Sequence, residues 1–109
     1  MEYKTTLNRI YKTIGVYFLY SNEELIYIGK TRVLGQRIQA SITERSAKHR
    51  KITSFSYYVT NNRSDAAILE MILIGIHKPI LNSVFKYKET PKMFVSPINV
   101  SELRRIDIN

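Results

Sequence analysis

The chain has 109 residues, no cysteine and two histidines, which predicts a single domain over residues 1–109 and excludes disulfides, cysteine-ligated zinc and thiol nucleophiles. The metal chemistry that remains is that of oxygen ligands and a cation such as Mg²⁺ or Mn²⁺. Seventeen Lys and Arg against nine Asp and Glu give a net charge of +8. This balance favours nucleic acid as the partner, with an anionic membrane or simple solubility as alternatives.

The first 29 residues predict a polar segment followed by a β-hairpin. Residues 1–13 are polar and basic. Residues 14–20 are rich in aromatic and β-branched side chains, and residues 24–29 are mostly apolar, so both segments are expected to be strands. The intervening residues 21–23 contain Ser and Asn, which favour turns, and such a short connection is typical of a hairpin.

The next 50 residues predict two helices separated by a third strand. Apolar residues every four positions predict a helix over 32–46, with Thr31 as its N-cap. Alternating apolar and polar residues predict a strand over 53–60, and an apolar segment predicts a helix over 64–77, closed by Pro79. The fold class is therefore α+β, with a small three-stranded antiparallel sheet flanked by helices in the order β-β-α-β-α.

Residues 83–109 are expected to be an irregular, basic C-terminal tail that packs on or extends a core of residues 14–82. A short edge strand over 93–95 and a final turn over 103–108 are the regular elements expected there. The longest apolar run, 66–76, is interrupted by Glu70 and is shorter than the about 20 residues that cross a bilayer. The sequence thus predicts a cytoplasmic protein with no membrane partner.

Glu70 is the most informative single residue. It is the only ionisable group between Ala66 and Ile76, and its helical neighbours three and four positions away are all apolar. An ion pair within the helix is therefore excluded, and a buried carboxylate without a partner is costly. Two interpretations stand. Glu70 either marks a narrow solvent-facing stripe, or it faces a cleft and binds a cation.

Tyr17 and Tyr27 form a second candidate feature. If they pair across the hairpin, the connecting loop has about three residues, a favoured length. Both phenols then point to the same face of the sheet, because side chains alternate along each strand. The alternative is that the two rings only pack a half-buried sheet.

Basic side chains supply the remaining candidates. Arg37 borders the apolar stripe of the first helix, three residues after Leu34, where its guanidinium can reach a cleft and bind phosphate oxygens. A surface arginine on a basic helix is the alternative. Five further cations are expected to contact nucleic-acid phosphates, unless they only form a solvated face: Lys30, Arg32, Lys48, Arg50 and Lys51.

The order of these residues is more specific than any one of them. The triplet 15–17 (Gly-Val-Tyr) is followed by the triplet 27–29 (Tyr-Ile-Gly), and Arg37 comes eight residues later. Glu70 lies on a later helix, ahead of Pro79 and Asn82. Over about residues 14–82 this arrangement resembles the GIY-YIG endonuclease family, whose fold agrees with the predicted order of elements.

The resemblance implies a divalent-metal-dependent endonuclease that hydrolyses DNA phosphodiester bonds and leaves 5′-phosphate and 3′-hydroxyl ends. It implies that Tyr17 is the general base, that Tyr27 positions the water and the phosphate, and that Arg37 contacts the scissile phosphate. Glu70 would hold one Mg²⁺ or Mn²⁺ ion per site, and Asn82 would support the site. Nearby positive charges are expected to favour the phenolate of Tyr17, since a free phenol has a pKa of about 10.

Ser41 departs from the family pattern. It lies one turn after Arg37, where many members have His or Tyr, and Lys48 or His49 is a candidate substitute. The departure supports an alternative of another class, a catalytically silent domain that binds nucleic acid or regulates a partner protein. A basic structural adaptor is a third interpretation. No nucleotide cofactor is expected, and the sequence leaves open a homodimer and the choice between DNA and RNA.

Overall fold

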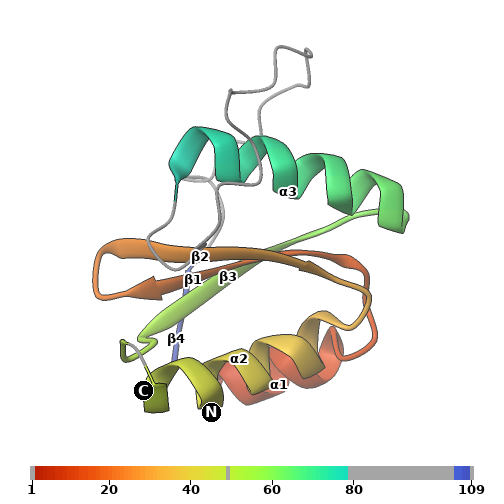
Figure 1. Ribbon diagram of the computed structural model, residues 1–109. Helices are drawn as coiled ribbons and strands as arrows, with labels where there is room; N and C mark the ends of the chain where they lie inside the picture. Colours follow the sequence, from red (N-terminus) through yellow and green to blue (C-terminus); the bar gives the residue numbers. More distant parts are fainter. Residues whose placement is uncertain (1, 49, 79–104, 109) are drawn as a thin grey trace.

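The computed structural model describes residues 2–48, 50–78 and 105–108 (Figure 1). Its regular elements confirm the α+β class and place helices on both sides of one sheet. They are helix α1 (Glu2–Arg9), strands β1 (Gly15–Ser21) and β2 (Glu24–Thr31), helix α2 (Leu34–Lys48), strand β3 (Ser54–Val59), helix α3 (Arg63–His77) and strand β4 (Ile106–Asp107).

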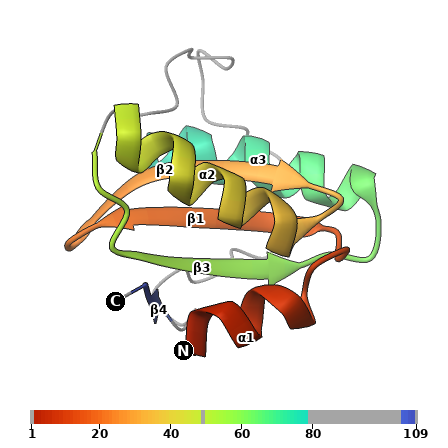
Figure 2. The same cartoon turned by 90° about the horizontal axis from the view of Figure 1, so that it is seen from below.

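The described strands form one antiparallel sheet in the order β2-β1-β3-β4, so β2 is an edge strand. Helices α1 and α2 cover one face of the sheet and α3 covers the other (Figures 1 and 2). The alternation of β1 divides the core accordingly, because Leu19 packs in the cluster with Leu34 of α2, whereas Phe18 packs in the cluster with Leu73 of α3. Helices α2 and α3 therefore pack on opposite faces of the same strand, β1.

Two elements were not predicted from the sequence. Residues 2–9 form α1, whose Leu7 and nearby Ile10 are buried against the α2 side of the sheet. Strand β4 pairs Ile106 with Phe55 of β3, so the described sheet has four strands rather than three. A helix of eight residues is unstable alone, and a two-residue strand exists only through its non-local partner, so neither leaves a clear local pattern. The edge strand expected over 93–95 lies outside the described residues.

The register of the hairpin differs from the predicted one. Tyr17 lies opposite Gly29, and Tyr27 lies opposite Leu19, so the two tyrosines are not a cross-strand pair. An irregularity in the register between Leu19 and Tyr20 shortens the turn to two residues, of which Asn22 has a φ of 56°. The offset between the tyrosines is two residues, and their side chains therefore still share a face.

The helix ends are close to the predicted ones. The Thr31 hydroxyl accepts a hydrogen bond from the Val33 amide at 3.0 Å, in the turn that leads into α2, which begins at Leu34. At α3 the Asn62 side chain caps the helix by accepting a hydrogen bond from the Asp65 amide at 2.8 Å. Within the described part of the chain, no helix is long and apolar enough to cross a membrane.

Candidate active site

Tyr17 lies at the centre of a buried polar group between β1 and α2. Its side chain is only 2% exposed. The Ser41 hydroxyl, from α2, donates a hydrogen bond to the Tyr17 hydroxyl at 3.4 Å. The Tyr27 ring lies 5.8 Å from the Tyr17 ring between centroids, at an interplanar angle of 40°. The position that departs from the family pattern, Ser41, is therefore in direct contact with the candidate base.

Gly29 lets the Tyr17 ring extend over the edge strand. A Cβ atom at position 29 would lie 2.6 Å from Cζ and 2.7 Å from the hydroxyl oxygen of Tyr17, closer than real Cβ atoms approach a neighbour. The end of the phenol ring therefore lies directly above the backbone of β2. Because β2 is the edge strand, the hydroxyl is carried from the neighbouring strand β1 to the border of the sheet.

We expect the substitution Gly29→Ala to displace the Tyr17 ring and to destabilise the fold by about 1–3 kcal/mol, the usual cost of overpacking. The free energy of unfolding, measured by chemical denaturation, checks this. In a Tyr17→Ala background the ring is gone, so alanine at 29 should then cost nothing further. A cost that persists without the ring would show that Gly29 serves another purpose.

Burial dominates the ionisation of Tyr17. It raises the pKa of the Tyr17 phenol to about 12, with a further rise from the neighbouring Tyr27, while the Ser41 hydrogen bond and the Arg37 charge lower it. Arg37 acts in the expected direction, but desolvation of the charged form outweighs it.

Arg37 lies on the exposed side of α2, one helical turn before Ser41. Its charge is close enough to lower the pKa of Tyr17, so the guanidinium belongs to the surroundings of the phenol. The structure thus brings together Tyr17, Tyr27, Arg37 and Ser41 on the α2 side of the sheet. Asn82 lies outside the described residues, so its predicted place in this site stays a prediction.

Glu70 reaches the same edge of the sheet from the opposite face. It lies in α3 with 8% of its surface exposed, so the interpretation as a solvent-facing stripe is wrong. Its Oε2 atom accepts a hydrogen bond from the Lys30 backbone amide at 3.0 Å. Lys30 follows Gly29 in the edge strand, and Tyr17 and Glu70 therefore approach adjacent residues of β2 from the two faces of the sheet.

The donor set at Glu70 fits a single magnesium-type cation. The described residues contain no group of three or more His, Cys, Asp or Glu side chains that could enclose a metal. Mg²⁺ is commonly held by one or two carboxylates while water and substrate phosphates fill its other positions. Oε2 of Glu70 accepts one hydrogen bond, from the Lys30 amide, and a carboxylate has further lone pairs with which it can bind a cation.

The cations that were predicted to bind nucleic acid do not form one cluster: two lie at one end of β2 and a third lies at the other end. Lys30 and Arg32 line a pocket at the end of the strand. At the other end of the strand, the Arg50 Nη1 atom forms an ion pair with Glu24 Oε1 at 2.6 Å. Glu24 and Lys30 are six residues apart in β2, which is about 20 Å at 3.3 Å per residue. Lys51 is exposed. The side chain of Lys48 and the whole of His49 lie outside the described part.

The antiparallel sheet, its two helical layers and the two tyrosines and glutamate at the edge of β2 define a domain of the GIY-YIG class. More particularly, the chain belongs to the family of the UvrC-like GIY-YIG domain, whose family model matches residues 13–83. The resemblance seen in the sequence is therefore confirmed, and the matched residues include every element from β1 to α3.

Relatives and solved structures agree with this assignment. The chain is 30% identical over 87 residues to the UvrABC system protein C of Dictyoglomus thermophilum, a match that covers 75% of this chain and 14% of the relative. It is 35% identical over 92 residues to the same protein of Petrotoga mobilis, covering 76% and 16%. The chain therefore spans only a small part of these relatives.

The fold is also similar to a solved structure, the GIY-YIG N-terminal endonuclease domain of UvrC from Thermotoga maritima bound to magnesium, its catalytic divalent cation. The TM-score is 0.56 with 24% sequence identity, and the match covers 72% of this chain and 93% of that one. This likeness confirms the fold.

Proposed function

We propose that this chain is an endonuclease that hydrolyses DNA phosphodiester bonds with one divalent metal ion at Glu70 and Tyr17 as the general base, leaving 5′-phosphate and 3′-hydroxyl ends. The observation that carries the proposal is the approach of Tyr17 and Glu70 to adjacent residues of the edge strand. Family membership, the net charge of +8 and the magnesium in the similar Thermotoga maritima domain support it.

The described side chains fit the chemical needs of the reaction. The Tyr17 phenolate takes the proton from the attacking water, and the neighbouring Tyr27 helps to place that water. Arg37 offers a planar pair of donors to the phosphate oxygens. When bound at Glu70, Mg²⁺ or Mn²⁺ supplies positive charge to the phosphate and to the leaving oxygen.

The raised pKa of Tyr17 predicts a rate that increases with pH. Only the phenolate accepts a proton, and below a pKa of about 12 its fraction grows about tenfold per pH unit. Ser41→Ala removes the hydrogen bond that lowers this pKa, so we expect a rate about fivefold lower at each pH and the same upward slope. Initial rates of plasmid nicking from pH 6 to 9 measure both.

Ser56→Ala is the matched control for Ser41→Ala. It removes a buried hydroxyl that is hydrogen-bonded to Tyr20 at 3.0 Å, and Tyr20 packs on the α3 side of the sheet. We expect its pH profile to follow that of the unmodified protein. If the cleavage rate does not change with pH, or if Ser41→Ala and Ser56→Ala lower the rate equally, Tyr17 is not the general base.

The proposed function is tested with supercoiled plasmid incubated with Mg²⁺, with Mn²⁺ or with a chelator. Nicking with either metal and none in chelator is expected, and DNA ligase alone should reseal the nicks if they carry 5′-phosphate and 3′-hydroxyl ends. Binding without nicking under every metal and pH condition would instead support the silent nucleic-acid-binding domain.

A further inference from the structure

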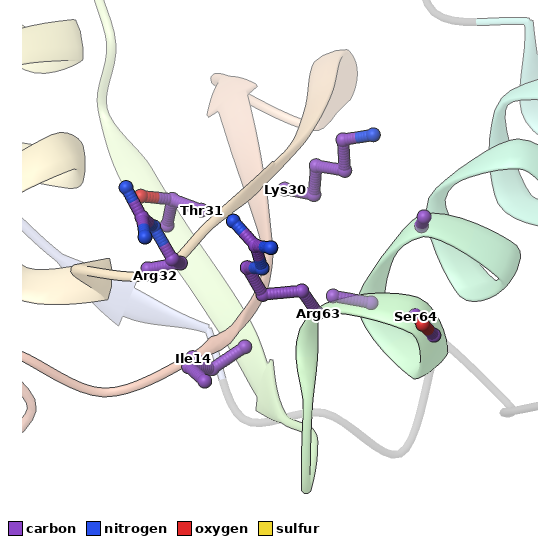
Figure 3. Close-up of a pocket in the computed structure, with 8 residues that line it drawn as sticks. Ile14, Lys30, Thr31, Arg32, Arg63 and Ser64 are labelled. Carbon is purple, nitrogen blue, oxygen red and sulfur yellow. The ribbon is translucent and has the colours of Figure 1, made fainter.

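A pocket of about 460 Å³ lies between the end of β2 and the beginning of α3 (Figure 3). Its volume is in the range of ligand-binding pockets. Three cationic side chains line it, Lys30, Arg32 and Arg63, together with apolar surface from Ile14 and Ala66. Arg63 is the first residue of α3 and was not among the residues predicted from the sequence.

The charge of this pocket is unbalanced. None of the described residues that line it is acidic, and the lining does not include Asp65, which lies in the same turn of α3 as Arg63. The guanidinium groups of Arg32 and Arg63 come from different elements and lie in the same space (Figure 3). Within the described residues, no ion pair joins either arginine or Lys30 to an acidic side chain. A concentration of unpaired positive charge favours binding of an anion, and guanidinium groups match phosphate oxygens well.

The pocket is next to the proposed catalytic site. Lys30 contributes to both, because it lines the pocket and its backbone amide donates to Glu70. Ala66 lines the pocket and precedes Glu70 by four residues, which is about 6 Å along a helix axis. One strand of a DNA duplex advances about 3.4 Å per nucleotide. This rise along α3, from Glu70 to one of the residues that line the pocket, corresponds to one or two nucleotides.

We propose that this pocket holds a backbone phosphate of the DNA strand one or two nucleotides from the bond that is cut. Arg32 and Arg63 bind the phosphate oxygens, and the apolar surface of Ile14 and Ala66 contacts the adjoining sugar. The inference rests on the proposed function. Arg32 and Arg63 then bind and position the DNA strand, whereas Tyr17 and Glu70 carry out the reaction.

Binding in chelator tests the pocket without requiring cleavage. We expect Arg32→Ala and Arg63→Ala each to weaken binding of a short DNA duplex about tenfold and to lower the slope of log affinity against log salt by about one. Arg9→Ala is the matched control, because Arg9 is an exposed arginine in α1 on the other side of the sheet. If the pocket variants lose no more affinity and no more slope than the control, the proposal is overturned.

Spectra of the arginine Nε–H groups show whether a phosphate is what binds. With a trinucleotide in chelator, the Arg32 and Arg63 signals should shift while the Arg9 signal stays. With the same trinucleotide carrying uncharged methylphosphonate linkages, the two shifts should disappear. Shifts that persist with the neutral strand, or no shift at a saturating concentration of the charged strand, would overturn the proposal.

The two proposals fail separately. If the unmodified protein does not nick plasmid in Mg²⁺ but both arginine signals respond to the charged trinucleotide, the phosphate pocket stands and the nuclease does not. If the protein nicks plasmid and Arg63→Ala cuts with an unchanged KM, the nuclease stands and the pocket does not. An Arg63→Ala variant with a KM raised about tenfold and a nearly unchanged kcat supports both.

Discussion

Replacing Glu70 with Gln is expected to lower metal-dependent cleavage about 10³-fold. The substitution keeps the size of a side chain that is 8% exposed and removes only its charge. Mg²⁺ binds carboxylate oxygen far better than amide oxygen, so metal affinity and cleavage should fall together. DNA binding should persist or tighten, because a negative charge near the phosphates is removed. A titration of nicking against Mg²⁺ and Mn²⁺ measures the effect.

The stability of the Glu70→Gln variant separates a metal ligand from a structural residue. The amide oxygen of Gln can still accept the Lys30 amide, and a costly buried charge is removed, so the melting temperature in chelator should stay level or rise. Glu44→Gln, an exposed change in α2, is the matched control and should leave cleavage unaltered. If Glu70→Gln cuts at the normal rate with normal metal dependence, Glu70 is not the ligand.

Replacing Tyr17 with Phe is expected to slow cleavage by about 10²–10⁴-fold, the usual contribution of a general base. Only a hydroxyl is lost, and the groups that hydrogen-bond to it are the side chains of Ser41 and Tyr27, so the fold and DNA binding should be nearly unchanged. The residual rate should also lose its increase with pH, because the group that titrates is gone. Single-turnover nicking rates over a range of pH measure both effects.

Tyr20→Phe is the control for this substitution. Tyr20 lies in the same strand, is similarly buried, and its hydroxyl is hydrogen-bonded to Ser56 at 3.0 Å, but it packs on the α3 side of the sheet. The same chemical change there should leave cleavage nearly intact. Near-normal turnover by the Tyr17→Phe variant would assign the base to another group, of which Tyr27 is the next candidate.

The parts of the fold that the sequence predicted are those with a strong local pattern. Aromatic, β-branched and apolar composition identified β1 and β2, and alternation identified β3. Apolar spacing identified α2, and an apolar segment with its end signals identified α3. Helix α1 is short and mostly polar, and its burial depends on contacts of Leu7 that no local pattern reveals. Strand β4 is two residues long and is defined only by its pairing with β3.

The candidate site was predictable as a set of residues and not as an arrangement. The sequence left Glu70 between a solvent-facing stripe and a cleft, because the choice depends on which face of α3 meets the sheet. The register of the hairpin, which sets Tyr17 against Gly29, follows from a backbone irregularity that the residue types do not specify. The contact of Ser41 with Tyr17 and the place of Arg63 in the pocket likewise depend on tertiary packing.

We propose that Tyr17 and Glu70, which approach β2 from opposite faces of the sheet, serve one catalytic centre at that edge strand. A double-mutant cycle of cleavage rates tests it most directly, with the variants Tyr17→Phe, Glu70→Gln and the pair. Residues that act as one unit are strongly non-additive, so the double variant should be about as slow as the slower single variant. If the two losses multiply in the double variant, the two residues act independently and the single-centre account is contradicted.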